Sequence, residues 1–212
     1  MMRKYFIYCL YLIGAMVFSC ANAGVYEDFF VAVNRDDGDT VRSLMQRGLD
    51  PNTRSPEGQT ALHLAMRDQS PRVAQALWAS AELDVNALNA SGETPLMMAA
   101  LRGDLAWAQR LVERSAKIHK EGWSPLHYAA TGPEPKIVAL LLDRGAPVDA
   151  PSPNGNTPLM MAARYGEEGS VDLLLARGAD KRLRNARELD AADYAKLAGR
   201  EFLLRRLDAS PR

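Results

Sequence analysis

Three histidines are the side chains of this 212-residue sequence best suited to acid–base or metal chemistry. An imidazole titrates near neutral pH, so it can act as a general base or as a metal ligand. His63 and His127 nevertheless occupy the same position in two similar six-residue segments, and Met97 and Met160 occupy it in two others. Methionine cannot exchange a proton, so this position does not require a titrating group. We therefore predict structural roles for His63 and His127, and a solvated loop position for His119.

The rest of the sequence contains none of the patterns associated with a catalytic nucleophile or a bound nucleotide. It has no G-x-S-x-G, no P-loop, no G-x-G-x-x-G and no H-E-x-x-H. Acidic pairs occur at Asp36-Asp37 and Glu167-Glu168, and negative charge of this kind suits the positive end of a helix dipole. The sequence therefore predicts a protein that is not an enzyme and that needs no cofactor.

Two methionine pairs, Met97-Met98 and Met160-Met161, offer a different kind of chemistry. Thioether sulfur binds soft ions such as Cu(I), so a periplasmic copper- or redox-handling protein that uses these methionines is one alternative. Methionine is also a flexible filler of hydrophobic cores, and one member of each pair takes the place of the repeated histidine. Another copy of the segment lies between the two pairs in the sequence. This arrangement favours the core role, and we predict no metal site.

The segment over 1–23 has the composition of a cleaved export signal. Arg3 and Lys4 form a short basic start, residues 5–18 are apolar apart from Gly14, and residues 21–23 supply the small side chains that a signal peptidase requires. An apolar stretch of this length spans about 21 Å as a helix, which is shorter than the roughly 30 Å hydrocarbon core of a bilayer. We predict cleavage after Ala23 and a periplasmic location.

Cys20 provides an alternative for the same segment. Bacterial lipoproteins are cut just before a cysteine, and residues 17–20 resemble that signal except that Phe18 is bulky where a small residue is usual. A lipid anchor at Cys20 is therefore the less favoured prediction. Both cysteines, Cys9 and Cys20, precede the predicted start of the mature chain at Gly24. A mature chain without cysteine has neither disulfides nor thiol chemistry.

The charge balance argues against two classes of partner. The sequence has 26 Lys and Arg residues and 26 Asp and Glu residues, and loss of Arg3 and Lys4 leaves a small acidic excess. Such a chain lacks the electrostatic basis for binding nucleic acid or an anionic membrane. We expect a protein partner, no nucleic acid, and no membrane insertion once the signal is removed.

The six-residue segment that contains the histidines recurs along the chain at nearly constant spacing. Copies begin at Thr60, Thr94, Ser124 and Thr157, and a degenerate copy begins at Asp190. In each full copy Thr or Ser can cap the N-terminus of a helix, and in three copies Pro follows at the first helical position. Leu and Ala then recur at helical spacing. Each copy therefore predicts the start of a short helix that buries one narrow face.

These segments resemble the T-P-L-H-x-A signature of the ankyrin repeat, which has a period of about 33 residues. Residues 41–52, 137–146 and 171–180 resemble its second helix and the glycine turn that follows. The resemblance implies an all-α solenoid of helix-turn-helix units joined by β-hairpin-like loops. It predicts one domain over 24–208 after a signal peptide over 1–23, with repeats at 27–59, 60–93, 94–123, 124–156 and 157–189 and a C-terminal cap at 190–208.

Two departures from the pattern carry structural predictions. Ser115 replaces the glycine that ends the second helix in other repeats, so we expect backbone strain or a different turn there. Pro135 stands between the two helices of the fourth repeat, and proline fits only the first turn of the helix that follows.

The resemblance also indicates which side chains bind a partner, because ankyrin proteins generally use hairpin tips and the exposed face of the first helices. The position before each motif and its fifth position are predicted to face outward, together with residues on the next helical turn. The candidate partner-binding residues are Gln59, Leu64, Glu93, Met98, Leu101, Trp123, Tyr128, Asn156, Met161, Arg164 and Tyr165. Tyr, Trp, Met and Arg are enriched in protein interfaces, although Trp123 and Tyr128 can alternatively pack the short loop of the third repeat.

The sequence as a whole predicts a monomeric, non-enzymatic protein-binding module exported to the bacterial periplasm. A signal peptide followed by an ankyrin array looks like exported bacterial ankyrin proteins, some of which are associated with peroxide defence. An accessory role to an envelope or oxidative-stress enzyme is therefore one specific expectation. The alternatives are the copper- or redox-handling protein described above and a secreted effector that binds a host protein.

Overall fold

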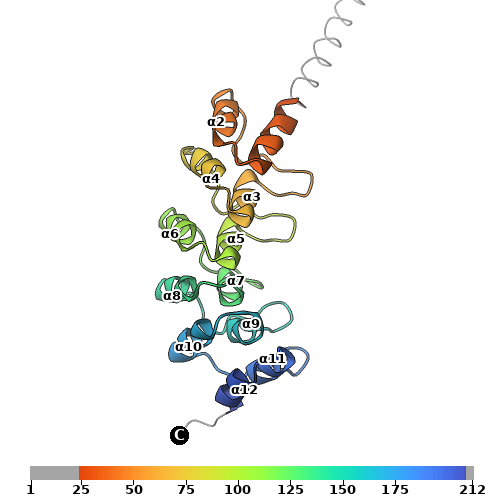
Figure 1. The fold of residues 1–212 in the computed structure, drawn as a ribbon, viewed down its shortest axis with the longest axis vertical. Helices are drawn as coiled ribbons and strands as arrows, with labels where there is room; N and C mark the ends of the chain where they lie inside the picture. Colours follow the sequence, from red (N-terminus) through yellow and green to blue (C-terminus); the bar gives the residue numbers. More distant parts are fainter. Residues whose placement is uncertain (1–23, 209–212) are drawn as a thin grey trace, which may run out of the picture.

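The computed structural model describes residues 24–208, which form a single curved stack of helix pairs (Figure 1). The predicted signal peptide, its cleavage site and both cysteines lie outside the described residues. In each pair the first helix lies on the side from which the hairpin loops project, and the second helix lies on the opposite side (Figure 1). Neighbouring first helices pack directly on one another. The structure confirms the predicted all-α solenoid.

The described helices fall into six consecutive pairs. The first pair is a helix over residues 24–34 with α2 (Gly38–Gln46). The others are α3 (Ala61–Asp68) with α4 (Pro71–Trp78), α5 (Pro95–Arg102) with α6 (Leu105–Glu113), α7 (Pro125–Thr131) with α8 (Pro135–Asp143), α9 (Pro158–Tyr165) with α10 (Glu168–Ala176), and α11 (Ala191–Leu197) with α12 (Glu201–Asp208).

The first helix of each motif-bearing pair starts at the polar residue that opens the motif. Thr94 and Thr157 adopt extended backbone conformations, and their hydroxyls accept hydrogen bonds from the N–H groups of Met97 and Met160, at 3.3 Å in both cases. Asp190 caps α11 in the same way. These caps satisfy N–H groups that a helix leaves unpaired at its N-terminus. The motif thus fixes where each first helix begins.

Small residues allow the first helices to pack closely. Ala99, Ala100, Ala129 and Ala130 are all at most 1% exposed. A Cβ atom added at Gly132 would lie 2.4 Å from the carbonyl oxygen of Ala100, so no larger residue fits there without a shift. The alanine pairs of the motif therefore determine the separation of neighbouring repeats.

The turn after the second helix uses a left-handed residue in each of four repeats. Gly48, Gly145 and Gly178 have φ values of 97°, 87° and 86°, and Ser115 has a φ of 66°. Glycine adopts this region at little steric cost, whereas a residue with a Cβ atom is strained there. The strain predicted at Ser115 is confirmed. Pro135 lies at the first position of α8, also as predicted.

Side chains in the loops connect each repeat to the next. Asn52 donates from Nδ2 to the carbonyl oxygen of Glu82 and accepts from the N–H of Asp84, both at 2.8 Å. Asn86 makes the same pair of contacts one repeat later, to the carbonyl of Ser115 at 3.2 Å and the N–H of Lys117 at 2.7 Å. These bonds hold successive loops in a fixed register.

An aromatic and arginine cluster reinforces the opposite side of the stack. Trp78 of α4 and Trp107 of α6 meet edge to face with ring centroids 5.3 Å apart. The Arg110 guanidinium lies 4.1 Å from the Trp107 centroid, and the Arg114 guanidinium lies 4.8 Å from that of Trp78. Arg114 also donates to the carbonyl oxygens of Trp78 and Ser80. The cluster thus joins the second and third repeats.

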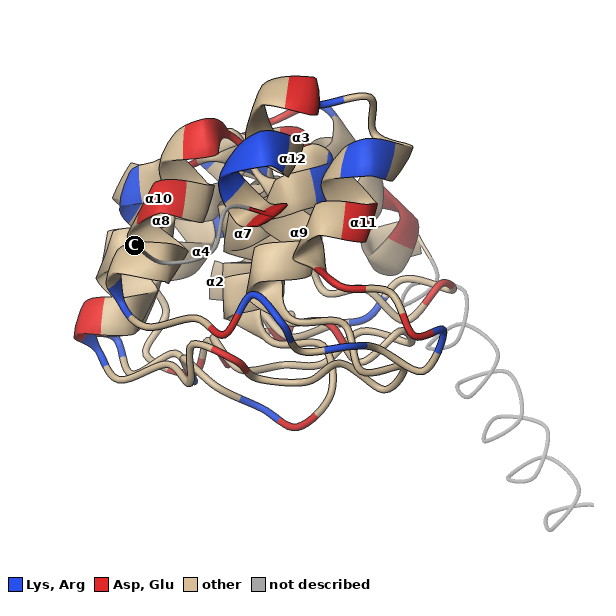
Figure 2. Cartoon of the chain, turned by 90° about the horizontal axis from the view of Figure 1, so that it is seen from below, with Lys and Arg blue, Asp and Glu red and all other residues tan. Residues whose placement is uncertain are grey.

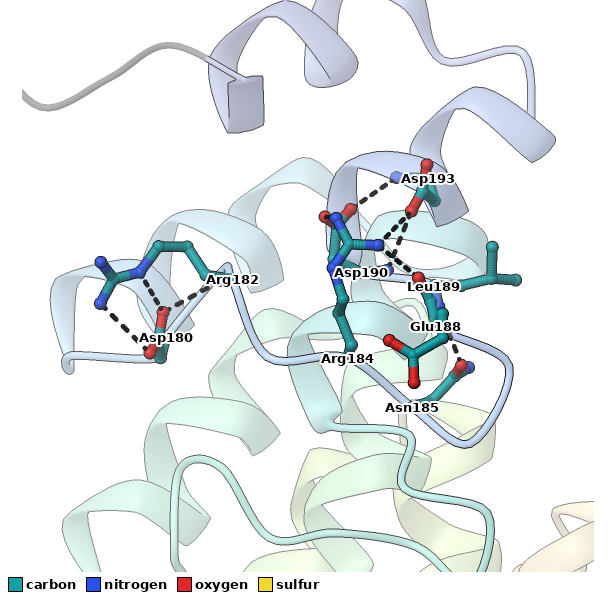
Figure 3. A network of polar contacts seen from close by, with 8 residues as sticks. All are labelled: Asp180, Arg182, Arg184, Asn185, Glu188, Leu189, Asp190 and Asp193. Atoms are coloured by element: carbon teal, nitrogen blue, oxygen red, sulfur yellow. Dashed lines mark hydrogen bonds and ion pairs between the residues drawn. The ribbon is translucent and has the colours of Figure 1, made fainter.

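A polar network holds the loop that precedes α11 (Figure 3). The Arg184 guanidinium donates to Asp190 at 2.9 Å and to the carbonyl oxygen of Glu188, and it pairs with Asp193 at 3.6 Å. The side-chain oxygen of Asn185 accepts the N–H of Leu189 at 3.1 Å. These contacts fix the last hairpin against the helix that it introduces. Residues 24–208 include no helix long and apolar enough to cross a bilayer.

Candidate functional site

The two motif histidines are buried links between neighbouring repeats. His63 Nδ1 accepts the N–H of Thr60 at 3.3 Å and lies 2.8 Å from its hydroxyl, while Nε2 lies 3.0 Å from the carbonyl oxygen of Glu93 in the next loop. His127 makes the equivalent contacts to Ser124 and to the carbonyl oxygen of Asn156. Because Nδ1 accepts an N–H bond, the proton must reside on Nε2, which donates to the loop carbonyl.

Burial also keeps these imidazoles neutral. His63 and His127 are at most 1% exposed, and this desolvation lowers the pKa of both rings, against the opposing effect of their backbone hydrogen bonds. Both nitrogens of each ring are engaged within the fold, so neither is placed to exchange a proton with a substrate. The structural role predicted for both histidines is confirmed.

Methionine replaces part of this arrangement in the other repeats. The Met97 sulfur accepts the N–H of Thr94 at 3.3 Å, and the Met160 sulfur accepts that of Thr157 at 3.4 Å. Both side chains are at most 1% exposed, and α7 lies between their helices (Figure 1). The sulfur atoms of Met97 and Met160 therefore lie in the interiors of separate repeats. Within residues 24–208, no group of three or more His, Cys, Asp or Glu side chains is arranged to hold a metal ion.

The predicted residues Trp123 and Tyr128 lie together in the middle of the array. The indole of Trp123 meets the His127 ring edge to face at 5.2 Å. The Tyr128 hydroxyl donates to Glu93 Oε1 at 2.6 Å, and Asn89 donates to the other carboxylate oxygen at 2.7 Å. Burial, and then the bond to Glu93, raise the pKa of the Tyr128 hydroxyl far above its usual value. Tyr128 is therefore a fixed hydrogen-bond donor.

A small hollow opens beside this pair. We call it the central hollow; it has a volume of about 150 Å³ and is lined by Leu101, Trp123, His127, Tyr128 and Thr131. Leu101 is 38% exposed, and Trp123 and Tyr128 are half-buried. An apolar cavity of this volume accommodates a group the size of benzene. The central hollow is thus suited to one apolar side chain.

A larger hollow lies at the N-terminal end of the same side. This N-terminal hollow has a volume of about 600 Å³ and is enclosed by the helix over 24–34, the loop over 55–59 and α3. The predicted residues Gln59 and Leu64 line it. Its position before α3 is equivalent to that of the central hollow before α7, because Gln59 and Leu64 correspond to Trp123 and Tyr128 in the repeat.

Four of the predicted binding residues do not face outward, contrary to expectation. Leu64, Met98 and Met161 are only 7–8% exposed and belong to the hydrophobic core. The close packing of first helices covers the fifth motif position in these three repeats, whereas Tyr128 at the same position of the fourth repeat stays half-buried. Asn156 is also buried, because its side-chain oxygen accepts from Asn185 at 2.7 Å and from the Tyr194 hydroxyl at 2.9 Å. Its role is to join the last two loops.

The remaining predicted residues are accessible but do not form one continuous surface. Gln59, Glu93 and Arg164 are half-buried, and Tyr165 is exposed. The Arg164 guanidinium lies over the rings of Tyr165 and Tyr194, at 5.1 and 5.6 Å. The structure therefore brings together Glu93, Leu101, Trp123 and Tyr128, and it places Gln59 and Arg164 toward opposite ends.

The repeats also match a known family. A model of ankyrin repeats in three copies matches residues 29–121 and 108–185, which together make up most of the chain. The chain is an ankyrin-repeat protein. Its helix pairs, capped motifs and projecting hairpins are those of the family, which supports the general function of a protein-interaction module.

Several known proteins resemble this ankyrin-repeat protein over most of its length. The B-cell lymphoma 3 protein homolog of Mus musculus is 37% identical over 154 residues, or 69% of this chain and 34% of that relative. SH3 and multiple ankyrin repeat domains protein 2 of Homo sapiens is 28% identical over 174 residues, or 80% of this chain and 9% of that relative. The chain thus spans about a third or less of the length of these curated relatives.

Two solved structures resemble the ankyrin array in three dimensions. The ankyrin repeat domain of Bcl-3 matches with a TM-score of 0.65 and 33% identity, covering 79% of this chain and 76% of that one. A chain in the structure of a predatory endopeptidase from Bdellovibrio bacteriovorus in complex with an immunity protein matches with a TM-score of 0.72 and 25% identity, covering 85% and 96%.

Apart from Gln59 and Leu64, the sequence motif of the ankyrin repeat did not reveal the residues that line the N-terminal hollow. Tyr26, Glu27, Phe30 and Glu57 line it, yet the first three lie in the helix that lacks the motif. The one signal available was the concentration of aromatic residues between 26 and 30 in an otherwise atypical first repeat. Their contact with the loop over 55–59 becomes visible only in the folded array.

Proposed function

We propose that this ankyrin-repeat protein is exported to the periplasm and binds a protein partner through the side of the array that carries the hairpin loops. The proposal includes the central hollow as the main contact, with Leu101, Trp123 and Tyr128 around one apolar side chain of the partner. We further propose that the protein catalyses no reaction itself, so that any enzymatic activity of the complex is that of the partner.

The observation that carries this proposal is the fixed, half-exposed aromatic pair beside the central hollow. Trp123 packs against the buried ring of His127, and Tyr128 donates a hydrogen bond to Glu93. Both side chains therefore already have restricted conformations and lose little conformational entropy on binding. Preorganised aromatic side chains contribute disproportionately to protein interfaces. Lys and Arg positions are interspersed with Asp and Glu positions along the loops (Figure 2), and this mixed charge favours a folded protein over nucleic acid as the partner.

A site-specific crosslinking experiment tests the contact. A photoreactive amino acid placed at Leu101 should link to one partner in intact cells, and Trp123→Ala with Tyr128→Ala should abolish that product while circular dichroism remains unchanged. The matched control carries the same photoreactive group at Phe202, which is 63% exposed in α12. Equal crosslinking from both positions, or a product that survives the double substitution, contradicts the placement.

The export part of the proposal rests on the composition of residues 1–23, which is that of an export signal. Cell fractionation should recover the protein from the periplasm, and N-terminal sequencing should give a mature chain that starts at Gly24. A chain that starts at a lipid-modified Cys20 would instead establish an anchored form. Recovery inside a host cell would contradict the periplasmic proposal and favour an effector.

One comparison favours an enzyme as the partner. The same fold occurs in a chain of the complex between an endopeptidase and an immunity protein, so a contact of this ankyrin-repeat protein with an envelope hydrolase is a specific form of the proposal. The crosslinked partner should then have hydrolase or peroxide-related activity that changes when the purified ankyrin-repeat protein is added. An unchanged activity would rule out this accessory role.

A further inference from the structure

The N-terminal hollow is a preformed site rather than a gap between mobile elements. The Tyr26 hydroxyl donates to the carbonyl oxygen of Arg54 at 2.9 Å, which ties the first helix to the first hairpin across the hollow. The Tyr26 ring in turn packs against Phe30, with centroids 5.1 Å apart. The aromatic wall therefore has a fixed position before any partner arrives.

Five apolar or aromatic side chains contribute to the lining of this hollow, and its volume is larger than one side chain requires. Tyr26, Phe30, Pro56 and Leu64 form the walls, and Val31 stands at the rim with 46% of its surface exposed. The volume of about 600 Å³ falls in the range of pockets that enclose an entire small ligand. It is four times that of the central hollow, so it accommodates two or three neighbouring side chains of a peptide.

The charge at the rim is negative. Glu27 and Glu57 are exposed carboxylates that line the hollow, and the Ser55 hydroxyl lowers the pKa of Glu57. Arg67 is the cation of the lining, and it is already paired: it donates to both carboxylate oxygens of Asp68, at 2.8 and 2.7 Å, and to Gln59 at 3.3 Å.

One cation next to the hollow offsets part of this negative charge. Arg54 donates to the carbonyl oxygens of Gly58 and Leu88, at 2.9 and 2.6 Å. Bonds to neutral carbonyl groups leave the positive charge of Arg54 in place. Because Asp68 balances Arg67, the two glutamates exceed Arg54 by one negative charge beside the aromatic wall. A cation is attracted both to carboxylates and to the faces of aromatic rings.

We propose that the N-terminal hollow binds a peptide segment of the protein partner that carries an aromatic or large aliphatic side chain next to a lysine or arginine. The apolar side chain packs between Phe30 and Leu64, and the basic head pairs with Glu27 and Glu57. This inference rests on the proposed protein-binding function, but it concerns a different site. It gives the array a second, charge-selective contact two repeats from the central hollow.

Blocked dipeptides provide a direct test in the absence of the natural partner. Acetyl-Phe-Arg-amide, acetyl-Phe-Glu-amide and acetyl-Gly-Arg-amide are titrated into the ¹⁵N-labelled protein and followed by NMR. Acetyl-Phe-Arg-amide should shift the amide signals of residues 26–34 and 55–67. The Phe-Glu peptide should bind about fivefold more weakly for lack of the ion pairs, and the Gly-Arg peptide about tenfold more weakly for lack of apolar burial.

Two double variants test whether the negative charge of Glu27 and Glu57 determines the peptide preference. Glu27→Gln with Glu57→Gln should remove the preference for the Phe-Arg peptide over the Phe-Glu peptide. Glu82→Gln with Glu113→Gln changes two exposed carboxylates elsewhere and should preserve that preference. Equal affinities for the two peptides in the unmodified protein, shifts confined to other residues, or no shifts at all would overturn the inference.

These outcomes are separate from the test of the proposed function. Failure of peptide binding at Glu27 and Glu57 leaves the crosslinking at Leu101 unaffected. Conversely, absence of a crosslinked partner at Leu101 would remove the proposed function without altering the NMR result.

Discussion

At the fourth position of the motif, an imidazole nitrogen and a thioether sulfur perform the same task. His63 and Met97 both accept the N–H of the residue that caps their helix, at 3.3 Å. Histidine adds a second bond to the next loop, which methionine cannot make. This explains why the two residue types alternate in one array without any requirement for proton transfer.

Replacing both histidines by methionine should reduce the sensitivity of the fold to acid. Their pKa values are lower in the folded than in the unfolded state, so the stability that they contribute is fully present above about pH 6.5. It declines as the pH falls, by up to about 1.4 kcal/mol per pH unit for each histidine. His63→Met with His127→Met should flatten the dependence of the urea midpoint on pH between 7 and 5.

His119→Met supplies the control for that experiment, because His119 is exposed in the loop before α7. It should leave the pH dependence of the unmodified protein intact. A double methionine variant that loses stability with acid as steeply as the unmodified protein would show that other groups dominate this pH range.

The residue scale also shows where sequence reasoning failed. The repeat pattern correctly predicted the role of His63, which depends on contacts within its own motif and on one loop. It was wrong about the exposure of Leu64, Met98, Asn156 and Met161. Their burial depends on the packing of the next repeat and, for Asn156, on Asn185 and Tyr194. Periodicity within one helix contains no information about that packing.

At the scale of the elements, the turns after the second helices show that serine can replace glycine only with backbone strain. Three of these turns use glycine at φ values of 86–97°, and the third repeat uses Ser115 at 66°. The backbone retains the turn, because the Ser115 N–H donates to the carbonyl oxygen of Val112 at 3.0 Å, as the Gly145 N–H does to that of Leu142 at 3.0 Å. The strain is therefore local to the serine.

Ser115→Gly should stabilise the protein by about 0.5–1 kcal/mol, because the substitution relieves a left-handed residue with a Cβ atom, while the greater flexibility of glycine in the unfolded chain offsets part of the gain. The free energy of unfolding from urea titration measures the change. Gly145→Ser, at the equivalent turn of the next repeat, should cost a similar amount. A neutral or destabilising Ser115→Gly would mean that the serine side chain contributes an interaction of its own.

Most element boundaries were predictable from short-range chemistry. Threonine or serine caps, the proline at the first helical position and the turn glycines act locally along the chain, so the sequence predicted the starts of α5, α7 and α9 and the place of Pro135. The two hollows were not predictable in this way. Each requires side chains from elements of neighbouring repeats to leave space between them.

At the scale of the whole molecule, the array depends on contacts between immediate neighbours. The last pair of helices is attached partly through Arg200, whose guanidinium donates to the carbonyl oxygens of Ala162, Ala163 and Gly166 at 2.8–3.2 Å. These carbonyls lie at the C-terminal end of α9, where a positive charge is favourable. Arg200 thus couples the cap to the fifth repeat.

Arg200→Met should loosen the cap without unfolding the rest of the array. Removal of a charged hydrogen-bond donor costs about 1.5–3 kcal/mol, so amide hydrogen exchange in α11 and α12 should accelerate at least about tenfold. Exchange in α3 to α6 should remain unchanged, since each repeat contacts its neighbours only.

Arg205→Met changes an exposed arginine of α12 and should not alter exchange in either region. Faster exchange throughout the array of the Arg200→Met variant would instead indicate that the repeats unfold as one cooperative unit.

The bonds made by Asn52 and Asn86 have a further consequence for the mechanics of the protein. Each asparagine joins one loop to the next and to no more distant part of the described chain. A force that pulls the two ends apart must therefore break these links in series. The array should extend in discrete steps, about one repeat at a time, so that a partner bound across several loops would act as a clamp against stretching.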